Sequence, residues 1–157
     1  MTGGEIDVLA DVAARVGELV DSLDVALAMI SPVPVDLASY SALPTNALIV
    51  IAGFLKTVEQ LEEQTSRLFR TLLVAKAVDV NGFYARDIAD RMEQLGILDD
   101  AVRWTDMVKL RNRLVHDYPL GREVRLARLH ESVAAAPYLR ATAGNVLKHL
   151  DTEEHRP

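Results

Sequence analysis

The residues of this chain that offer chemistry lie in one segment, which we call the signature: Arg111-Asn112-Arg113-Leu114-Val115-His116-Asp117-Tyr118. Histidine is the side chain that takes and gives protons near neutral pH, so His116 is a candidate acid–base group. Arg111 presents a planar fork of charged donors that matches phosphate oxygens. Tyr118 adds a hydroxyl that is able to orient a group, donate a hydrogen bond or be modified. Together these side chains indicate reaction at a phosphate.

The phosphodiester of RNA is the substrate that this set fits. A histidine promotes attack by the ribose 2′-hydroxyl on the adjacent phosphorus, and a guanidinium stabilises the charge that builds on the phosphoryl oxygens. Because the 2′-hydroxyl of the RNA is itself the nucleophile, the reaction needs no metal-activated water. The sequence also has no His/Cys/Asp cluster at metal-ligand spacing, no glycine-rich phosphate loop and no Gly-x-Ser-x-Gly elbow. We therefore expect RNA cleavage with no metal and no other cofactor.

Helical spacing separates the candidate residues in space. Arg111 and Tyr118 are seven residues apart and share a face, while Asn112 and His116 are four apart and share a neighbouring face. The five steps from Arg111 to His116 place the two side chains about 140° apart on a regular helix. One straight helix therefore does not direct both at one phosphate. The site requires the helix to end near His116, or a second protomer to supply groups across a dimer cleft.

Apolar residues spaced three and four apart predict the helices that position this segment. Prolines at 32, 34 and 44 predict a connecting loop over 31–44, Gly96 predicts a helix end, and Asp99 or Asp100 caps the signature helix. Residues 151–157 are expected to form a frayed tail. The expected helices span about 5–30, 45–78, 83–95, 99–118 and 122–150.

Composition agrees with one helical domain. The chain has 157 residues, half of them hydrophobic, with 5% aromatic residues, abundant Ala and Leu, and no cysteine. This length and apolar content suffice for one buried core, and Ala and Leu are strong helix formers. We predict a single all-α domain over 1–157, an antiparallel four- to five-helix bundle.

The charge of the chain is unevenly distributed. The net charge is −6, yet residues 103–128 hold seven basic and three acidic residues, a local +4, which leaves −10 for the rest. A basic stretch within an acidic chain favours a phosphate partner near the signature, although ordinary variation of helix surfaces also produces such stretches. We expect Lys109, Arg113 and Arg122 to attract RNA phosphates without sequence specificity.

Nothing in the sequence predicts a membrane segment. The N-terminus is acidic and polar rather than basic and apolar, and the longest apolar run, residues 47–55, is far shorter than the roughly 20 residues of a membrane span. We expect a cytoplasmic protein.

The signature and its context resemble the HEPN superfamily. More narrowly, Arg-x4-His-x-Tyr at the end of a fourth helix is similar to the motif of HepT-like toxins, with Arg111, His116 and Tyr118 at the motif positions and Asn112 matching the common Arg-Asn start. The upstream stretch 83–98, which ends in Leu-Gly-Ile-Leu, is similar to the short helix of that family.

The resemblance implies a HEPN-like bundle that forms a homodimer with a composite RNA-cleaving cleft. It implies that Arg111 and His116 are catalytic, supported by Asn112 and Tyr118. It further implies a partner, a nucleotidyltransferase antitoxin of the MNT type, which neutralises the ribonuclease toxin by AMPylation of Tyr118.

Two other interpretations of the signature stay open from the sequence. Some HEPN bundles are non-catalytic subunits that bind nucleotides or support a nucleotidyltransferase. Alternatively, the signature is a solvated helix end, in which His and Arg simply favour the negative end of the helix dipole.

Overall fold

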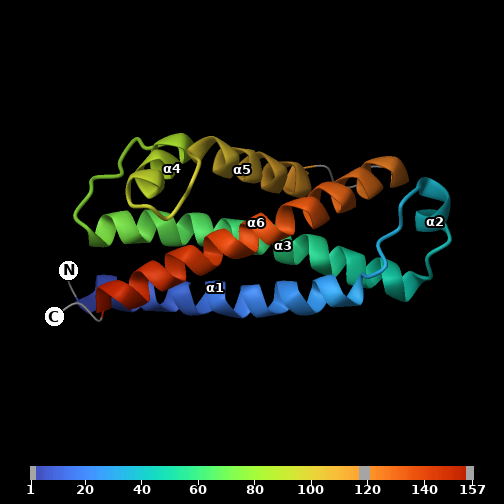
Figure 1. Ribbon diagram of the computed structural model, residues 1–157, viewed down its shortest axis with the longest axis horizontal. Coiled ribbons are helices and arrows are strands. Elements are labelled where there is room, and N and C mark those ends of the chain that lie inside the picture. The colour runs from blue at the N-terminus through green and yellow to red at the C-terminus, as the bar shows by residue number, and fades with distance from the viewer. Residues whose placement is uncertain (1–2, 117–120, 155–157) are drawn as a thin grey trace.

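The structure, a computed structural model, describes residues 3–116 and 121–154. These residues form helices and no strands, which confirms the predicted all-α fold (Figure 1). Consecutive long helices run in opposite directions, and α4 and α5 cover the side of α3 that lies away from α1. The helices of the described residues are α1 (Gly3–Met29), α2 (Leu37–Ser41), α3 (Thr45–Ala75), α4 (Ala85–Gln94), α5 (Ala101–His116) and α6 (Arg122–Glu154).

The prediction of a helix-free connection over 31–44 is wrong, because α2 lies within it. Asp36 and Ser39 form a capping box: the Ser39 amide donates to the Asp36 carboxylate at 2.8 Å, and the Asp36 amide donates to the Ser39 hydroxyl at 3.2 Å. This box satisfies amides that a helix start otherwise leaves unpaired. Tyr40 is buried and anchors the short helix to the core.

The ends of the long helices differ from prediction by a few residues. α3 ends at Ala75 rather than near residue 78, and its N-cap, Pro44, makes no side-chain hydrogen bond there. α6 continues beyond the predicted Leu150 to Glu154, so residues 151–154 are helical rather than frayed. The predicted stop after α4 is confirmed, because Gly96 has a φ of 73°, a left-handed conformation that glycine adopts at little cost.

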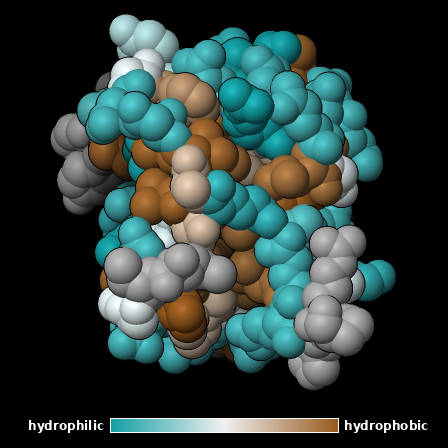
Figure 2. All heavy atoms as spheres, turned by 90° about the vertical axis from the view of Figure 1, so that its left-hand side faces the viewer, coloured by the Kyte–Doolittle hydropathy of each residue, from teal (hydrophilic) through white to brown (hydrophobic). Residues whose placement is uncertain are grey.

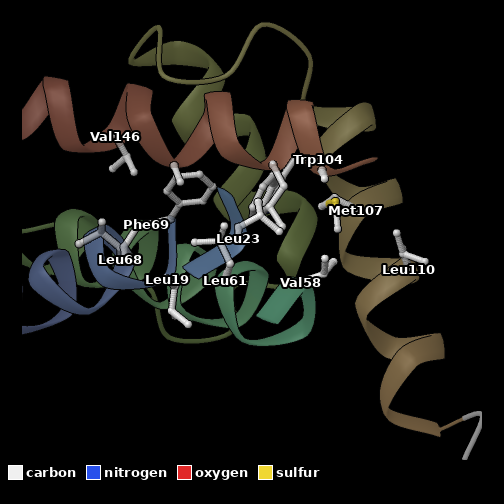
Figure 3. Packing of buried hydrophobic residues seen from close by; sticks show 14 of the residues in the cluster. Leu19, Leu23, Val58, Leu61, Leu68, Phe69, Trp104, Met107, Leu110 and Val146 are labelled. Carbon is white, nitrogen blue, oxygen red and sulfur yellow. The ribbon is translucent and has the colours of Figure 1, made fainter. Parts of the chain in front are cut away.

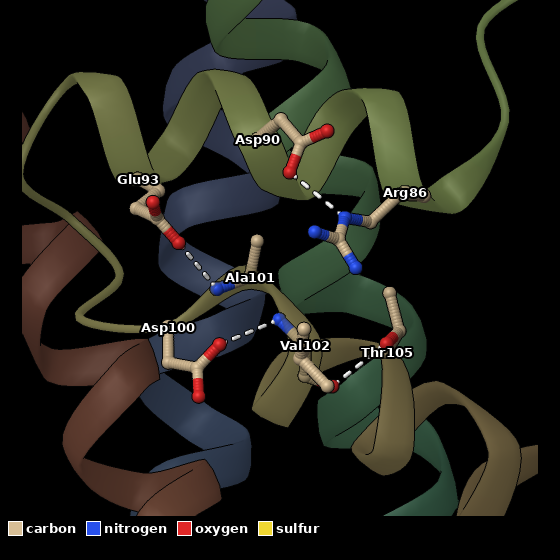
Figure 4. A network of polar contacts seen from close by, with 7 residues as sticks. All are labelled: Arg86, Asp90, Glu93, Asp100, Ala101, Val102 and Thr105. Carbon is tan, nitrogen blue, oxygen red and sulfur yellow. Dashed lines mark hydrogen bonds and ion pairs between the residues drawn. The ribbon is translucent and has the colours of Figure 1, made fainter.

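The start of the signature helix α5 is fixed by two carboxylates (Figure 4). The predicted cap at Asp100 is confirmed, since its carboxylate accepts the Val102 amide at 2.8 Å. Glu93 of α4 accepts the Ala101 amide at 2.7 Å. These bonds satisfy amides of the first turn that have no partner within the helix, and the bond from Ala101 ties α4 to α5.

The middle of α5 is held by the core (Figure 3). Trp104 is 1% exposed, and its ring centroid lies 5.0 Å from that of Phe69 on α3. Met107 and Leu110 follow on the same face and are also buried. Each fully buried side chain of this size contributes about 1.5–3 kcal/mol, so the core holds α5 from Ala101 to Leu110.

At the end of the bundle that holds both termini, hydrophobic side chains gather in the middle of a hydrophilic face (Figure 2). None of the helices in the described ranges combines the length with the apolar character that crossing a bilayer requires.

Candidate functional site

Arg111 is anchored to the interior of the bundle by a carboxylate. Its Nε donates to Oε2 of Glu62 on α3 at 2.7 Å. Glu62 is fully buried, whereas the Arg111 side chain keeps 29% of its surface exposed. Because Nε is the inner nitrogen of the guanidinium, the bond holds the group from behind and leaves its two outer nitrogens for another acceptor. Within the described residues, no other partner of Arg111 is found.

The carboxylate that anchors Arg111 is itself held in place. The Ser66 hydroxyl donates to Oε1 of Glu62 at 2.6 Å, one turn further along α3. Burial raises the pKa of the Glu62 carboxyl above its usual value, and the hydrogen bond from Ser66 and the charge of Arg111 oppose that rise. Both carboxylate oxygens therefore have partners, as a buried charge requires.

His116 is the last residue of α5, and it is exposed to solvent. The next four residues lie outside the described ranges, so the helix end that the spacing argument required near His116 stays a prediction. Up to that residue α5 is a regular helix, so the separation of about 140° between the directions of Arg111 and His116 remains. Arg111 faces α3, and His116 faces solvent.

The predicted phosphate-attracting residues are partly paired. Arg113 lies 2.8 Å from Glu131 of α6, and Lys109 lies 3.8 Å from Asp106 of its own helix. Arg122 is exposed at the start of α6.

Carboxylates that lie outside residues 103–128 in the sequence form ion pairs with arginines of this basic stretch. Arg128 also contacts Glu131 at 2.8 Å, and Glu62 pairs with Arg111. The +4 charge counted along the sequence therefore overstates the positive charge at this surface.

The two remaining signature residues are placed differently. Asn112 is exposed on α5, beside Arg111. Tyr118 lies outside the described residues, so its expected roles as a supporting and modified residue stay predictions.

Glu62 is the site residue that the sequence analysis missed. It occupies a position of the buried stripe of α3, between Leu61 and Thr65, where a charged residue is rare. A carboxylate on the apolar face of an amphipathic helix signals a buried cation partner elsewhere in the fold. That signal was present in the sequence, but the sequence did not identify Arg111 as the partner.

Comparison with known proteins gives a match to a family model. No curated protein and no solved structure matches the chain significantly. The family model HepT-like, described as ribonuclease HepT-like, matches residues 45–133. The match covers more than half of the chain, from the start of α3 into α6, and includes Glu62, Arg111 and His116. The chain belongs to the HepT-like ribonuclease family.

Proposed function

We propose that this protein is a metal-independent endoribonuclease toxin, with Arg111 and His116 as its catalytic residues. The observation that carries the proposal is the Glu62–Arg111 pair, in which a buried carboxylate holds a partly exposed guanidinium by its inner nitrogen. Such a fixed fork of donors suits a phosphoryl oxygen. His116, which is exposed on the same helix, supplies the acid–base group.

The proposed reaction uses only groups of the protein and the RNA. His116 takes the proton of a ribose 2′-hydroxyl, and the 2′-oxygen bonds to the adjacent phosphorus. The bond from phosphorus to the 5′-oxygen breaks, and this oxygen receives the proton back from the protonated imidazole of His116, which restores the neutral histidine. The products are a 2′,3′-cyclic phosphate and a 5′-hydroxyl. Arg111 stabilises the negative charge on the phosphoryl oxygens while the bonds change.

A homodimer cleft completes the site in this proposal. Arg111 and His116 point in directions about 140° apart on one regular helix. When the ends of two α5 helices meet across a two-fold axis, Arg111 of one protomer faces the histidine of the other. A symmetric contact of this kind is the commonest in oligomers.

The test is cleavage of a short single-stranded RNA in excess EDTA. We expect fragments that end in 2′,3′-cyclic phosphate, because the 2′-hydroxyl is the nucleophile. The matched control is the same oligonucleotide with 2′-fluoro riboses, which lacks the nucleophile and is expected to stay intact. Loss of cleavage of the unmodified RNA in EDTA, or equal cleavage of both oligonucleotides, would contradict the mechanism.

We further propose that a nucleotidyltransferase antitoxin of the MNT type neutralises the protein by AMPylation of Tyr118. Co-expression with such an enzyme is expected to add the mass of one AMP group, and Tyr118→Phe is expected to abolish the addition. Intact-protein mass spectrometry measures both. Tyr84, which is 81% exposed, provides the control, because Tyr84→Phe should leave the modification in place. Modification that persists in Tyr118→Phe would disprove this assignment.

One observation favours a second candidate, a non-catalytic subunit that supports a nucleotidyltransferase. The charge of Arg111 is already balanced by Glu62, which weakens its attraction for a phosphate. The two candidates differ in the cell. Expression of the chain without its partner arrests growth if it is a toxin, and leaves growth unchanged if it is a supporting subunit.

A further inference from the structure

A cavity of about 260 Å³ opens beside the proposed site. Apolar side chains from three helices form most of its wall, and among the described residues Tyr40 of α2 contributes the one aromatic ring. The main apolar wall residues are Leu48, Ile51 and Leu55 of α3, Leu114 of α5 and Val124 of α6.

The cavity continues the seam between α3 and α5 that holds the Glu62–Arg111 pair. Leu114 follows Arg111 by three residues, so the two side chains are neighbours on one face of α5. On α3, Glu59 lines the cavity and precedes Glu62 by three residues, again on one face. When one phosphate of a bound strand contacts Arg111, the neighbouring nucleotide of that strand is therefore within reach of the cavity.

The size and polarity of the cavity suit a flat organic ring. Its volume equals that of roughly nine waters at about 30 Å³ each, and a nucleobase has a comparable number of non-hydrogen atoms. Proteins that bind single-stranded RNA take unstacked bases out of water against aromatic and apolar side chains. An apolar cavity with Tyr40 in its wall offers such a surface.

The rim of the cavity has the charge that an RNA backbone requires. Of the charged residues in the described ranges, Lys56, Arg125, Arg128 and the carboxylate of Glu59 line it. Glu59 pairs with Lys56 at 2.7 Å, and Arg128 contacts Glu131 at 2.8 Å. Arg125 is exposed, and no ion pair of its side chain is found in the described ranges. The rim is thus positive in a chain whose net charge is −6.

We propose that this cavity holds one unpaired base of the RNA substrate, next to the phosphate that Arg111 contacts. The inference rests on the proposed ribonuclease function, because it takes RNA as the ligand. The apolar wall removes the base from water, and Arg125 attracts the phosphate at the rim. The protein then positions the RNA by one base and one phosphate at once.

The experiment measures binding separately from cleavage. A fluorescent single-stranded oligonucleotide with 2′-fluoro riboses, which cannot be cleaved through the 2′-position, is prepared intact and with an abasic site at each position in turn. We expect one position at which loss of the base weakens binding to the wild type about tenfold or more, in line with the stacking contribution of a base. Fluorescence anisotropy gives the dissociation constants.

Ala52→Phe fills the cavity from α3, where Ala52 is exposed and lines it. The variant is expected to bind the intact oligonucleotide as weakly as the wild type binds the abasic one, and the abasic one unchanged. Val124→Phe repeats the test from α6 and guards against misfolding of one variant. Ala14→Phe on α1 is the matched control, because Ala14 is exposed and does not line the cavity; it should behave as wild type.

Three results would overturn the inference. The first is an abasic series in which no position matters. The second is an equal loss of affinity for intact and abasic oligonucleotides in both cavity variants. The third is a loss of self-association of the cavity variants in sedimentation while their affinity still depends on the base as in the wild type. This result would assign the cavity to a second copy of the chain. Cleavage of unmodified RNA, measured in parallel, decides the proposed function separately from these results.

Discussion

Replacing His116 with alanine is expected to slow RNA cleavage by about 10²–10⁴-fold, because a positioned acid–base group contributes that much to a proton-transfer step. The side chain is exposed at the last residue of α5. The free energy of unfolding should therefore change by no more than about 0.5 kcal/mol. Initial rates in excess EDTA, together with thermal unfolding, measure the two effects.

His149→Ala is the matched control for His116. His149 lies near the far end of α6, where its Nε2 is 3.4 Å from Glu153. This variant loses an imidazole as well but should cleave RNA at the wild-type rate. If His116→Ala and the wild type cleaved equally fast, His116 would have no part in the reaction.

The second large effect is on stability rather than rate. Arg111→Ala leaves the Glu62 carboxylate buried with Ser66 as its remaining partner. Breaking a buried ion pair by removing one partner costs about 3–5 kcal/mol. Because Arg111 is 29% exposed, we expect a loss near the lower end, about 3 kcal/mol at pH 8. Chemical denaturation gives this difference.

The stability lost in Arg111→Ala should depend on pH in a defined direction. The pKa of Glu62 in the folded protein is already raised by burial, and Arg111 opposes that rise, so Arg111→Ala raises the pKa further. A folded-state pKa above the unfolded value means that the folded state binds the proton more tightly. The contribution of Glu62 to the stability of the variant is then highest below the unfolded pKa, about 4.3 for a glutamate, and is lost as pH rises through the folded pKa. The difference in free energy of unfolding between Arg111→Ala and the wild type should therefore become smaller in acid.

Two variants test this explanation. When Glu62→Gln/Arg111→Ala is compared with Glu62→Gln, neither protein has a titrating group at position 62, so the pH-dependent part of the loss should disappear. Arg113→Ala removes a neighbouring arginine whose pair with Glu131 is more than one third exposed on both sides. It should cost less than about 1 kcal/mol, with little dependence on pH. A pH-independent loss in Arg111→Ala would show that Glu62 is not the cause.

These expectations affect how activity data are read. Arg111 is both a proposed catalytic residue and part of a buried pair, so inactivity of Arg111→Ala has two explanations. His116 has only the first role, since it is exposed. Activity lost in His116→Ala at unchanged stability is therefore the more direct evidence for catalysis.

The helices were predictable because their signals are local. Apolar spacing, the cap at Asp100 and the stop at Gly96 each depend on residues close together in the chain. The short helix α2 was missed although its capping box at Asp36 and Ser39 is equally local. Prolines in the same stretch favoured a loop and outweighed that weaker signal.

The site was predictable only in part. The sequence by itself determined the residue types at 111, 112 and 116, their spacing and the helix that carries them. It also determined that Arg111 and His116 diverge, since this follows from helical geometry alone.

The tertiary structure alone decided which groups surround that segment. Residues 49 positions apart, Glu62 and Arg111, meet because apolar faces of α3 and α5 pack against each other. The cavity beside them needs α2, α3, α5 and α6 together. Contacts between distant segments depend on how whole helices pack, and no short stretch of sequence encodes that arrangement. The sequence thus determined the chemistry available, and the packing decided where that chemistry is held.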